Sequence, residues 1–203
     1  MTIHPVKINV LVEEIFVQGV FAKTSFESMN AILADDNKRQ SRFVWVHLQG
    51  FLNHSAMISK MLDSPGKSSI AKARSSQLCA TLQVDADSAV FDRNARNNVE
   101  HLDERLDNWL DHNSFNLLEL VVDDRKGFEF VTLPRSLPNS TMFVRRLLIL
   151  DEMVFVTQGR IGLEETRLSP LFDEICKIVD KAYAYISGDT SITNFNPGIL
   201  PIR

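Results

Sequence analysis

Apolar residues recur every three or four positions along several long stretches of this chain, which is the spacing that places side chains on one face of an α-helix. The first two stretches span residues 7–33 and 41–62, and the second is apolar over so much of its circumference that we expect a largely buried helix. The same pattern predicts a long helix over 88–111, a last helix over 169–187 and a shorter helix over 70–82.

Residues with strong positional preferences mark the expected helix ends. Ser169 and Pro170 suit the N-cap and the first helical position of the last helix, and Gly188 suits its C-terminal end. Either Asp85 or Asp87 is expected to cap the long helix that follows them.

The periodicity changes after about residue 115, where short β-rich segments alternate with turn-forming residues. Residues 116–122 and 128–133 predict two strands joined by a hairpin turn of the composition Asp-Asp-Arg-Lys-Gly. Further strands are expected over the segments 142–150, 153–157 and 160–163. These segments together predict a small antiparallel sheet.

The patterns add up to a mainly α protein, an up-down bundle of about four long helices with a small antiparallel β insertion before the last helix. We expect a single domain over residues 1–188, with the insertion at about 115–163. The remaining residues, 189–203, show no periodicity and are expected to form an extended C-terminal tail.

Composition narrows the class of protein. No apolar run approaches the roughly 20 residues that a membrane span needs, and the N-terminus lacks the pattern of a secretory signal, so we expect a cytoplasmic protein without membrane contact. Cys79 and Cys176 lie far apart and without CxxC spacing, which indicates neither a disulfide framework nor a zinc site. The net charge of −4 counts against a general nucleic-acid coat but leaves room for a local site.

The predicted helix over 88–111 carries the candidate chemistry. Its apolar residues form one stripe, Phe91, Ala95, Val99, Leu102, Leu106 and Trp109. Asn97 and His101 share a line that points away from this stripe, and Arg96 lies on its flank. The side chain of His101 is therefore expected to face solvent, another helix or a ligand. The segment from Arg96 to His101 has the pattern R-N-x-x-x-H.

An arginine followed directly by a polar residue, with a histidine a few positions later inside a helix, resembles the signature of the HEPN superfamily. Its members are typically dimeric helical domains, and many are metal-independent endoribonucleases whose arginine and histidine residues line a cleft at the two-fold axis. The resemblance covers this helix and, more loosely, the long helices around it. It implies a homodimer that acts on RNA without a cofactor, as a toxin with an antitoxin partner or in a defence system.

The residue types suit that chemistry. Histidine can take or give a proton near neutral pH, and arginine presents a fork that matches phosphate. We expect His101 to transfer protons, Arg96 to hold the phosphate and Asn97 to orient the histidine. A five-residue offset places Arg96 and His101 about 140° apart around an ideal helix. A two-fold-related helix or a local distortion is therefore needed to bring both to one phosphate.

A basic segment upstream is a weak candidate for contacts with the RNA backbone. Lys67, Lys72 and Arg74 lie within it, whereas the motif helix itself is acidic. Arg145 and Arg146 are a secondary candidate for a phosphate contact, with an ordinary solvated strand edge as the default interpretation.

Three other interpretations stay open. In an ordinary solvated helix face, Arg96 pairs with Glu100, and His101 lies against Glu104 or Arg105. A non-catalytic helical dimer would use the same polar patch for protein interaction or nucleotide binding, and the acidity of the motif helix favours it. A metal-dependent hydrolase would combine His101 with two histidines of the second helix, His47 and His54, although the paired spacings of helical metal sites are absent.

Overall fold

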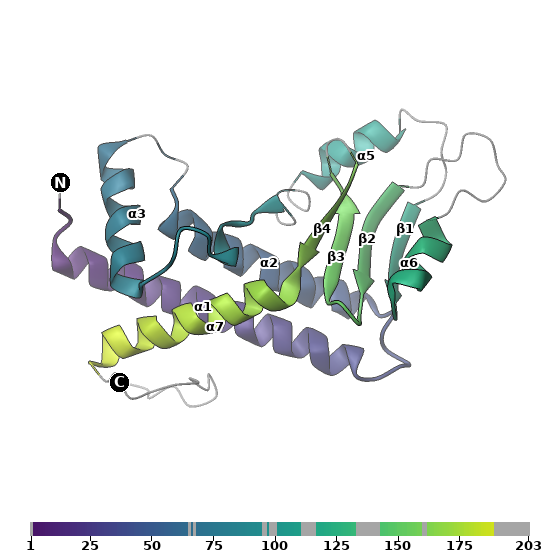
Figure 1. Cartoon of the computed structure of the whole chain (residues 1–203), viewed down its shortest axis with the longest axis horizontal. Helices are drawn as coiled ribbons and strands as arrows, with labels where there is room; N and C mark the ends of the chain where they lie inside the picture. The colour runs from purple at the N-terminus through teal and green to yellow at the C-terminus, as the bar shows by residue number, and fades with distance from the viewer. Residues whose placement is uncertain are drawn as a thin grey trace. The chain divides into compact units, whose positions relative to one another are not determined.

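The computed structural model describes most of the chain (Figure 1). The described residues are 2–64, 66, 68–94, 97, 101–110, 117–132, 143–159 and 162–188, without the side chains of Leu102, Arg105, Asn108, Val131 and Thr132. The expected tail over 189–203 lies outside them.

The structure is mainly helical with one small mixed sheet, as the sequence predicts at the level of fold class. Its elements are α1 (Pro5–Leu33), α2 (Arg42–Leu62), α3 (Ser69–Leu82), the 3-10 helix η1 (Ala89–Phe91), α5 (Leu102–Leu110), β1 (Leu117–Val122), α6 (Arg125–Thr132), β2 (Phe143–Ile149), β3 (Val154–Gln158), β4 (Leu163–Arg167) and α7 (Leu168–Ser187). Among the described residues, no helix is both long and apolar enough to cross a lipid bilayer.

The chain forms two compact units. Unit 1 takes its described residues from the ranges 1–35, 41–92 and 170–203, and unit 2 takes them from 36–40 and 93–169. Unit 1 therefore holds α1, α2, α3, η1 and most of α7, whereas unit 2 holds the sheet, α5 and α6.

Unit 1 is built on the antiparallel pair α1 and α2, which lie side by side (Figure 1). Phe26 of α1 stacks on Phe172 of α7 with ring centroids 4.2 Å apart, and Phe51 of α2 packs on Phe26 at 4.9 Å. Each such buried aromatic or aliphatic side chain stabilises the fold by about 1.5–3 kcal/mol. Gly19 lies where α1 approaches α7, because a Cβ at this position would overlap the side chain of Val179.

The expected helices of unit 1 are confirmed, and serine caps explain where two of them begin. The Ser41 side chain accepts from the Phe43 N–H at the start of α2, and the Ser68 side chain accepts from the Ala71 N–H at the start of α3. Gly188 follows α7 with φ +70°, the left-handed conformation expected at a helix C-terminus.

Two expected helix starts are wrong. The long helix over 88–111 does not begin at Ser88, because that side chain caps the short η1 and Asp92 leaves it in an extended conformation. Phe91 is thus not part of the motif helix, and neither Asp85 nor Asp87 caps it. The last helix begins at Leu168, two residues before the expected first helical residue, Pro170, since β4 runs directly into it.

The sheet of unit 2 is mixed rather than antiparallel. Its strand order is β1-β2-β3-β4, with β1 parallel to β2 and the other two pairings antiparallel. The expected hairpin is wrong because residues 125–132 form helix α6 in place of a second strand. Asp124 starts this helix, since its side chain accepts from the Gly127 N–H at 2.8 Å. Helix α6 is the described helical part of the connection between β1 and β2, and a parallel strand pair requires a long connection of this kind.

Strands β2 and β3 confirm two further β expectations, over residues 142–150 and 153–157, with small shifts. They pair antiparallel on either side of residues 151–152, with Leu148 opposite Phe155. Strand β4 begins at Leu163, whereas the sequence predicted a strand that ends there. Strand β1 is an edge strand of the described sheet. The Gln40 side chain covers part of that edge, because its Nε2 donates to the Val121 carbonyl and its Oε1 accepts from the Val121 N–H.

Candidate functional site

Asn97 and His101 lie one helical turn apart in unit 2, just before α5. The Asn97 N–H donates to the Arg93 carbonyl at 2.9 Å, and the His101 N–H donates to the Asn97 carbonyl at 3.0 Å. These are i to i−4 bonds, so the backbone supports the helical spacing on which the motif depends. Arg96, the third residue of the predicted site, lies outside the described residues.

The imidazole of His101 contacts a carboxylate. Its Nδ1 lies 3.1 Å from Oε1 of Glu104, and the two side chains are 53% and 65% exposed. An ionised carboxylate only accepts hydrogen bonds, so Nδ1 carries the hydrogen in this contact. In the neutral ring, Nε2 is then the nitrogen with the free lone pair. An exposed pair of this kind contributes little to stability, but it selects one tautomer of the histidine.

The surroundings of His101 are acidic. Asp103, Glu104 and Asp107 are all exposed on α5, and the first turn of this helix carries two of them. Carboxylates in the first turn are favourable for the helix because they oppose the positive end of its dipole. They also repel a polyanion, so an RNA site here depends on cations outside α5.

The weak RNA-binding candidates have different surroundings. Lys67 lies outside the described residues, Lys72 is exposed on α3, and Arg74 is half-buried with its Nη2 donating to the Lys60 carbonyl at 3.2 Å. Lys72 and Arg74 belong to unit 1, whereas Asn97 and His101 belong to unit 2. Among Lys67, Lys72 and Arg74, Lys72 is the residue whose side chain is both described and exposed.

The two arginines of β2 share one carboxylate that the sequence analysis missed. Glu119 of β1 lies 2.8 Å from Nη1 of Arg146 and 3.4 Å from Nη1 of Arg145. The parallel pairing of β1 with β2 creates this contact, because it sets Glu119 opposite Arg146. The expected hairpin would have placed other residues there. Both guanidinium groups therefore have an ion-pair partner inside the sheet.

His54 takes part in a hydrogen-bonded chain within unit 1. Its Nδ1 lies 2.7 Å from Oε1 of Gln18, and Nε2 of Gln18 donates to Oε1 of Glu14 at 2.7 Å. The ring also packs against Phe21, with centroids 5.1 Å apart. Burial lowers the pKa of His54 below its ordinary value of 6.5. Over the described part of the chain, no three His, Cys, Asp or Glu side chains are grouped to hold a metal ion.

A hollow of about 600 Å³ lies in unit 2 beside the end of β1. Its charged residues are engaged with one another, since Arg39 contacts Asp36 at 2.6 Å and Asp123 at 2.9 Å. Asp124, the other acidic residue of the lining, caps α6. The polar lining of the hollow is thus part of the local structure, and the candidate chemistry stays with His101.

The chain matches no protein family, no curated protein and no solved structure in the three comparisons with known proteins.

Proposed function

We propose that this protein is a HEPN-like endoribonuclease that cleaves RNA without a metal ion, at a site made of Arg96, Asn97 and His101. The observation that carries the proposal is that the contact between Nδ1 of His101 and Glu104, which an ordinary solvated helix face also predicts, leaves Nε2 of an exposed imidazole as a proton acceptor. The helical bonding from Asn97 to His101 supports it, because it maintains the spacing of the motif.

The proposed reaction uses one proton acceptor, one proton donor and one fixed cation. Nε2 of His101 takes the proton of a ribose 2′-hydroxyl, and the oxygen attacks the adjacent phosphorus. The bond from phosphorus to the 5′-oxygen breaks, and a protonated group returns a proton to that oxygen. The products are a 2′,3′-cyclic phosphate and a 5′-hydroxyl. The guanidinium of Arg96 stabilises the charge that develops on the phosphate oxygens.

A second copy of the chain is part of this proposal. One helix does not bring Arg96 and His101 easily to the same phosphate, since they are about 140° apart on an ideal helix. A cleft between two copies would supply one histidine as the base and the other as the acid. The same proposal includes an up-down arrangement of four long helices and a homodimer. It also includes a toxin or defence role, with an antitoxin or another protein as the partner.

The acidity around His101 favours a second candidate function. Asp103, Glu104 and Asp107 expose three carboxylates within two turns of α5. Such a surface suits a basic protein partner better than RNA. In this alternative the protein is a non-catalytic helical dimer that uses the same polar patch for protein interaction or nucleotide binding.

An RNA-cleavage assay in excess chelator tests the first proposal. The comparison uses the wild type, Arg96→Ala and His101→Ala at matched folding and oligomeric state, with His47→Ala as the control for loss of a histidine elsewhere. We expect chelator-resistant cleavage in the wild type and the control, and a loss of at least about 100-fold in both site variants. Absence of cleavage by well-folded wild type, or cleavage that survives both substitutions, would overturn the assignment and favour the non-catalytic alternative.

A further inference from the structure

Strand β2 contains a bulge where it pairs with β1. Glu119 of β1 is opposite Arg146, and the β1 residue before Glu119 is opposite Val144. Arg145 is therefore an extra residue in β2. The same bulge lets Val144 and Leu147 pack into one core cluster, although residues three apart in a regular strand point to opposite faces. Because bulges redirect side chains and are common beside functional sites, Arg145 is a candidate ligand-binding residue.

The charge of Arg145 is only partly compensated. Oε2 of Glu119 lies 2.8 Å from Nη1 of Arg146 but 3.4 Å from Nη1 of Arg145. One carboxylate thus serves two guanidinium groups, and these three side chains together carry one net positive charge. The side chain of Arg145 is 33% exposed, compared with 16% for Arg146, so a ligand can reach Arg145 from solvent.

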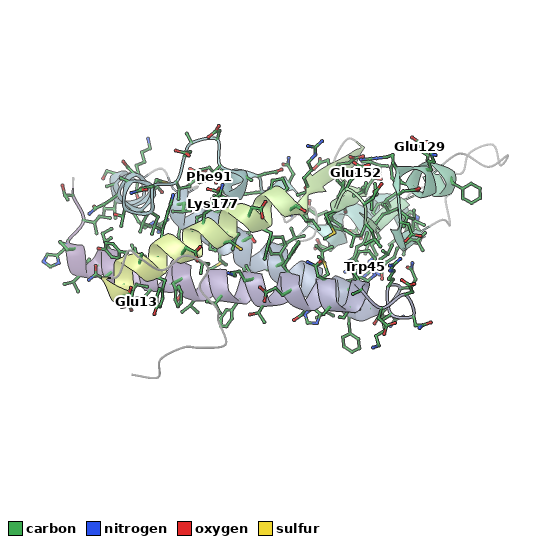
Figure 2. All side chains as sticks on the ribbon, turned by 60° about the horizontal axis from the view of Figure 1, so that its bottom comes forward. Glu13, Trp45, Phe91, Glu129, Glu152 and Lys177 are labelled. Atoms are coloured by element: carbon green, nitrogen blue, oxygen red, sulfur yellow. The ribbon has the colours of Figure 1, made fainter. Side chains whose placement is uncertain are left out.

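Arg125 of the same unit shows the contrast with a fully compensated arginine. It donates to both oxygens of Glu152, which is labelled in Figure 2, and to both oxygens of Glu165. Glu152 belongs to the turn after β2, whereas Arg145 lies near the start of this strand. Two carboxylates therefore compensate Arg125, and Arg145 shares one.

Two buried N–H groups of unit 2 lack a hydrogen-bond acceptor within the described part of the chain. They are Nε of Arg145 and Nε1 of Trp109 on α5. Buried donors in folded proteins nearly always have an acceptor. Since both groups can only donate, the missing partner is an acceptor, and a bound ligand would supply it.

Trp109 and Arg145 lie at the same end of the sheet. The ring of Trp109 packs against Phe143, the first residue of β2, with centroids 6.4 Å apart. Arg145 follows Phe143 by two residues, a step of about 6.6 Å along a strand. Figure 1 shows α5 beside this end of the sheet. A ligand held where α5 meets the start of β2 would therefore meet both donors.

A phosphate group has the chemistry that suits these donors. It carries several acceptor oxygens and a negative charge, and the fork of a guanidinium binds two of its oxygens at once. The indole N–H would bind a further oxygen. An RNA bound near His101 also needs a cation outside α5, because the carboxylates of that helix repel its backbone.

We propose that Arg145 and Trp109 form a phosphate subsite that binds a backbone phosphate of the RNA. The proposal rests on the proposed function, since α5, which carries Trp109, begins directly after His101. Binding to the subsite is measured with an RNA that cannot be cleaved. A failure of the subsite is therefore distinguishable from a failure of the nuclease proposal.

The test RNA is single-stranded and fully 2′-O-methylated, so it lacks the hydroxyl that the proposed cleavage requires. We expect Arg145→Gln to raise its Kd at least about fivefold, because a charged phosphate contact is lost. The slope of log K against log salt concentration should also fall by about 0.7, the value of one phosphate contact on a single strand. Circular dichroism verifies that the variants fold.

Arg39→Gln is the matched control for Arg145→Gln. It removes an arginine of unit 2 whose side chain is 32% exposed, but which contacts two carboxylates, Asp36 and Asp123. We expect this variant to change the Kd less than about twofold and to keep the salt slope of the wild type. Equal effects of the two substitutions on Kd and on the salt slope would overturn the subsite.

The indole N–H of Trp109 reports binding directly. The chain has two tryptophans, so a nitrogen–hydrogen correlation NMR spectrum of the wild type contains two indole signals. Trp109→Phe identifies one of them by removing it, and Trp45 of unit 1 gives the reference signal. We expect the test RNA to shift the Trp109 signal alone, and Arg145→Gln to abolish that shift. A Trp109 signal that RNA leaves in place would overturn the proposal.

Inorganic phosphate separates the two sources of the anion. A Trp109 shift with RNA supports the proposal, whereas a shift with inorganic phosphate alone would reject RNA as the ligand. A wild type that binds the test RNA through Arg145 but cleaves no RNA would retain the subsite and overturn the nuclease. A wild type that cleaves RNA while Arg145→Gln binds the test RNA unchanged would overturn the subsite and retain the nuclease.

Discussion

Arg125 at the start of α6 donates to both oxygens of Glu165 on β4, from Nη1 at 2.6 Å and from Nη2 at 3.0 Å. The same guanidinium donates to both oxygens of Glu152 in the turn between β2 and β3, at 2.9 and 2.7 Å. One arginine thus joins three segments of unit 2 that are far apart in the sequence. The planar five-donor geometry of arginine makes this double bidentate contact possible, and lysine cannot reproduce it.

Replacement of Arg125 by alanine is expected to destabilise unit 2 by about 1 kcal/mol, a modest value because the group is partly exposed and solvent screens the ion pairs. Lys126→Ala is the matched control, since it removes an exposed cation from the next position of the same helix. Urea denaturation followed by circular dichroism measures both variants. Equal stability losses in the two variants would show that the ion pairs of Arg125 contribute nothing specific.

The pH dependence of stability follows from Glu152. Its hydrogen bonds to Arg125 lower the pKa of the Glu152 carboxyl below the ordinary value of 4.5. The unfolded chain therefore binds a proton at this group at a higher pH than the folded chain does. Its stabilising contribution is present above about pH 4.5 and is lost as the pH falls through the lowered folded value.

The corresponding variant is Glu152→Gln, which cannot ionise. We expect it to be less stable than the wild type at neutral pH, and to lose less stability between pH 5 and the acid limit of folding. Thermal unfolding at a series of pH values makes the comparison, with Glu129→Gln on α6 as a control. Parallel pH profiles for the wild type and Glu152→Gln would exclude this carboxyl as a source of acid sensitivity.

His54 predicts a second pH effect at higher pH, in unit 1. Burial lowers its pKa below 6.5, so the unfolded state binds more protons at this residue when the pH falls below that value. Stability is therefore lost progressively as the pH falls from about 6.5 toward the folded pKa. His54→Gln is expected to flatten this part of the profile, and His47→Gln tests whether loss of any histidine from α2 does the same. An unchanged profile in His54→Gln would refute the assignment.

Gly19 gives a test of packing between α1 and α7. A methyl group at this position overlaps the side chain of Val179, so Gly19→Ala is expected to destabilise the protein by about 1–3 kcal/mol, despite the higher helix propensity of alanine. The double variant Gly19→Ala with Val179→Ala should recover part of this loss, because it removes the overlapping group. Gly162→Ala is the control, since a Cβ there meets nothing within 4 Å. Additive losses in the double variant would contradict the proposed overlap.

The parts of the structure that could be predicted from the sequence depend on local information. Ser41 and Ser68 mark helix starts through contacts with residues two or three positions away, and the sequence shows those residues directly. The β-rich composition of residues 128–133 predicts a strand after a turn over residues 123–127, but residues 125–132 form helix α6. The Asp124 cap and the parallel pairing of β1 with β2 favour a helix in this segment. Because that pairing joins residues about 26 positions apart, the local pattern of the sequence does not show it.

The same limit applies to the candidate site. The spacing from Asn97 to His101 and the neighbouring Glu104 lie on one short segment, so a helical pattern suffices to bring them together. The contact between Gln18 and His54 joins residues 36 positions apart and depends on the register of α1 against α2. No periodicity in either helix specifies that register. The sequence therefore indicates which histidines face outward. It does not indicate which residues those histidines contact when the partner is far away in the chain.

The contact between His101 and Glu104 makes a prediction about the proposed RNA cleavage. In Glu104→Gln, the amide can turn its NH₂ group toward Nδ1, which would leave the hydrogen on Nε2 and remove the proton acceptor. Because the pair is exposed, the ring can still rotate to the productive tautomer, so we expect kcat to fall by only about tenfold, less than the loss on removing the histidine. Folding and oligomeric state should not change.

Asp107→Asn is the matched control for that prediction, since it removes the same charge from the next turn of α5 without touching His101 in the described structure. A charge effect on RNA binding would lower KM in both variants, because each removes a carboxylate that repels phosphate. A tautomer effect would lower kcat in Glu104→Gln alone. If the two variants change kcat equally, Glu104 acts through its charge, and the contact loses its role in orienting the histidine.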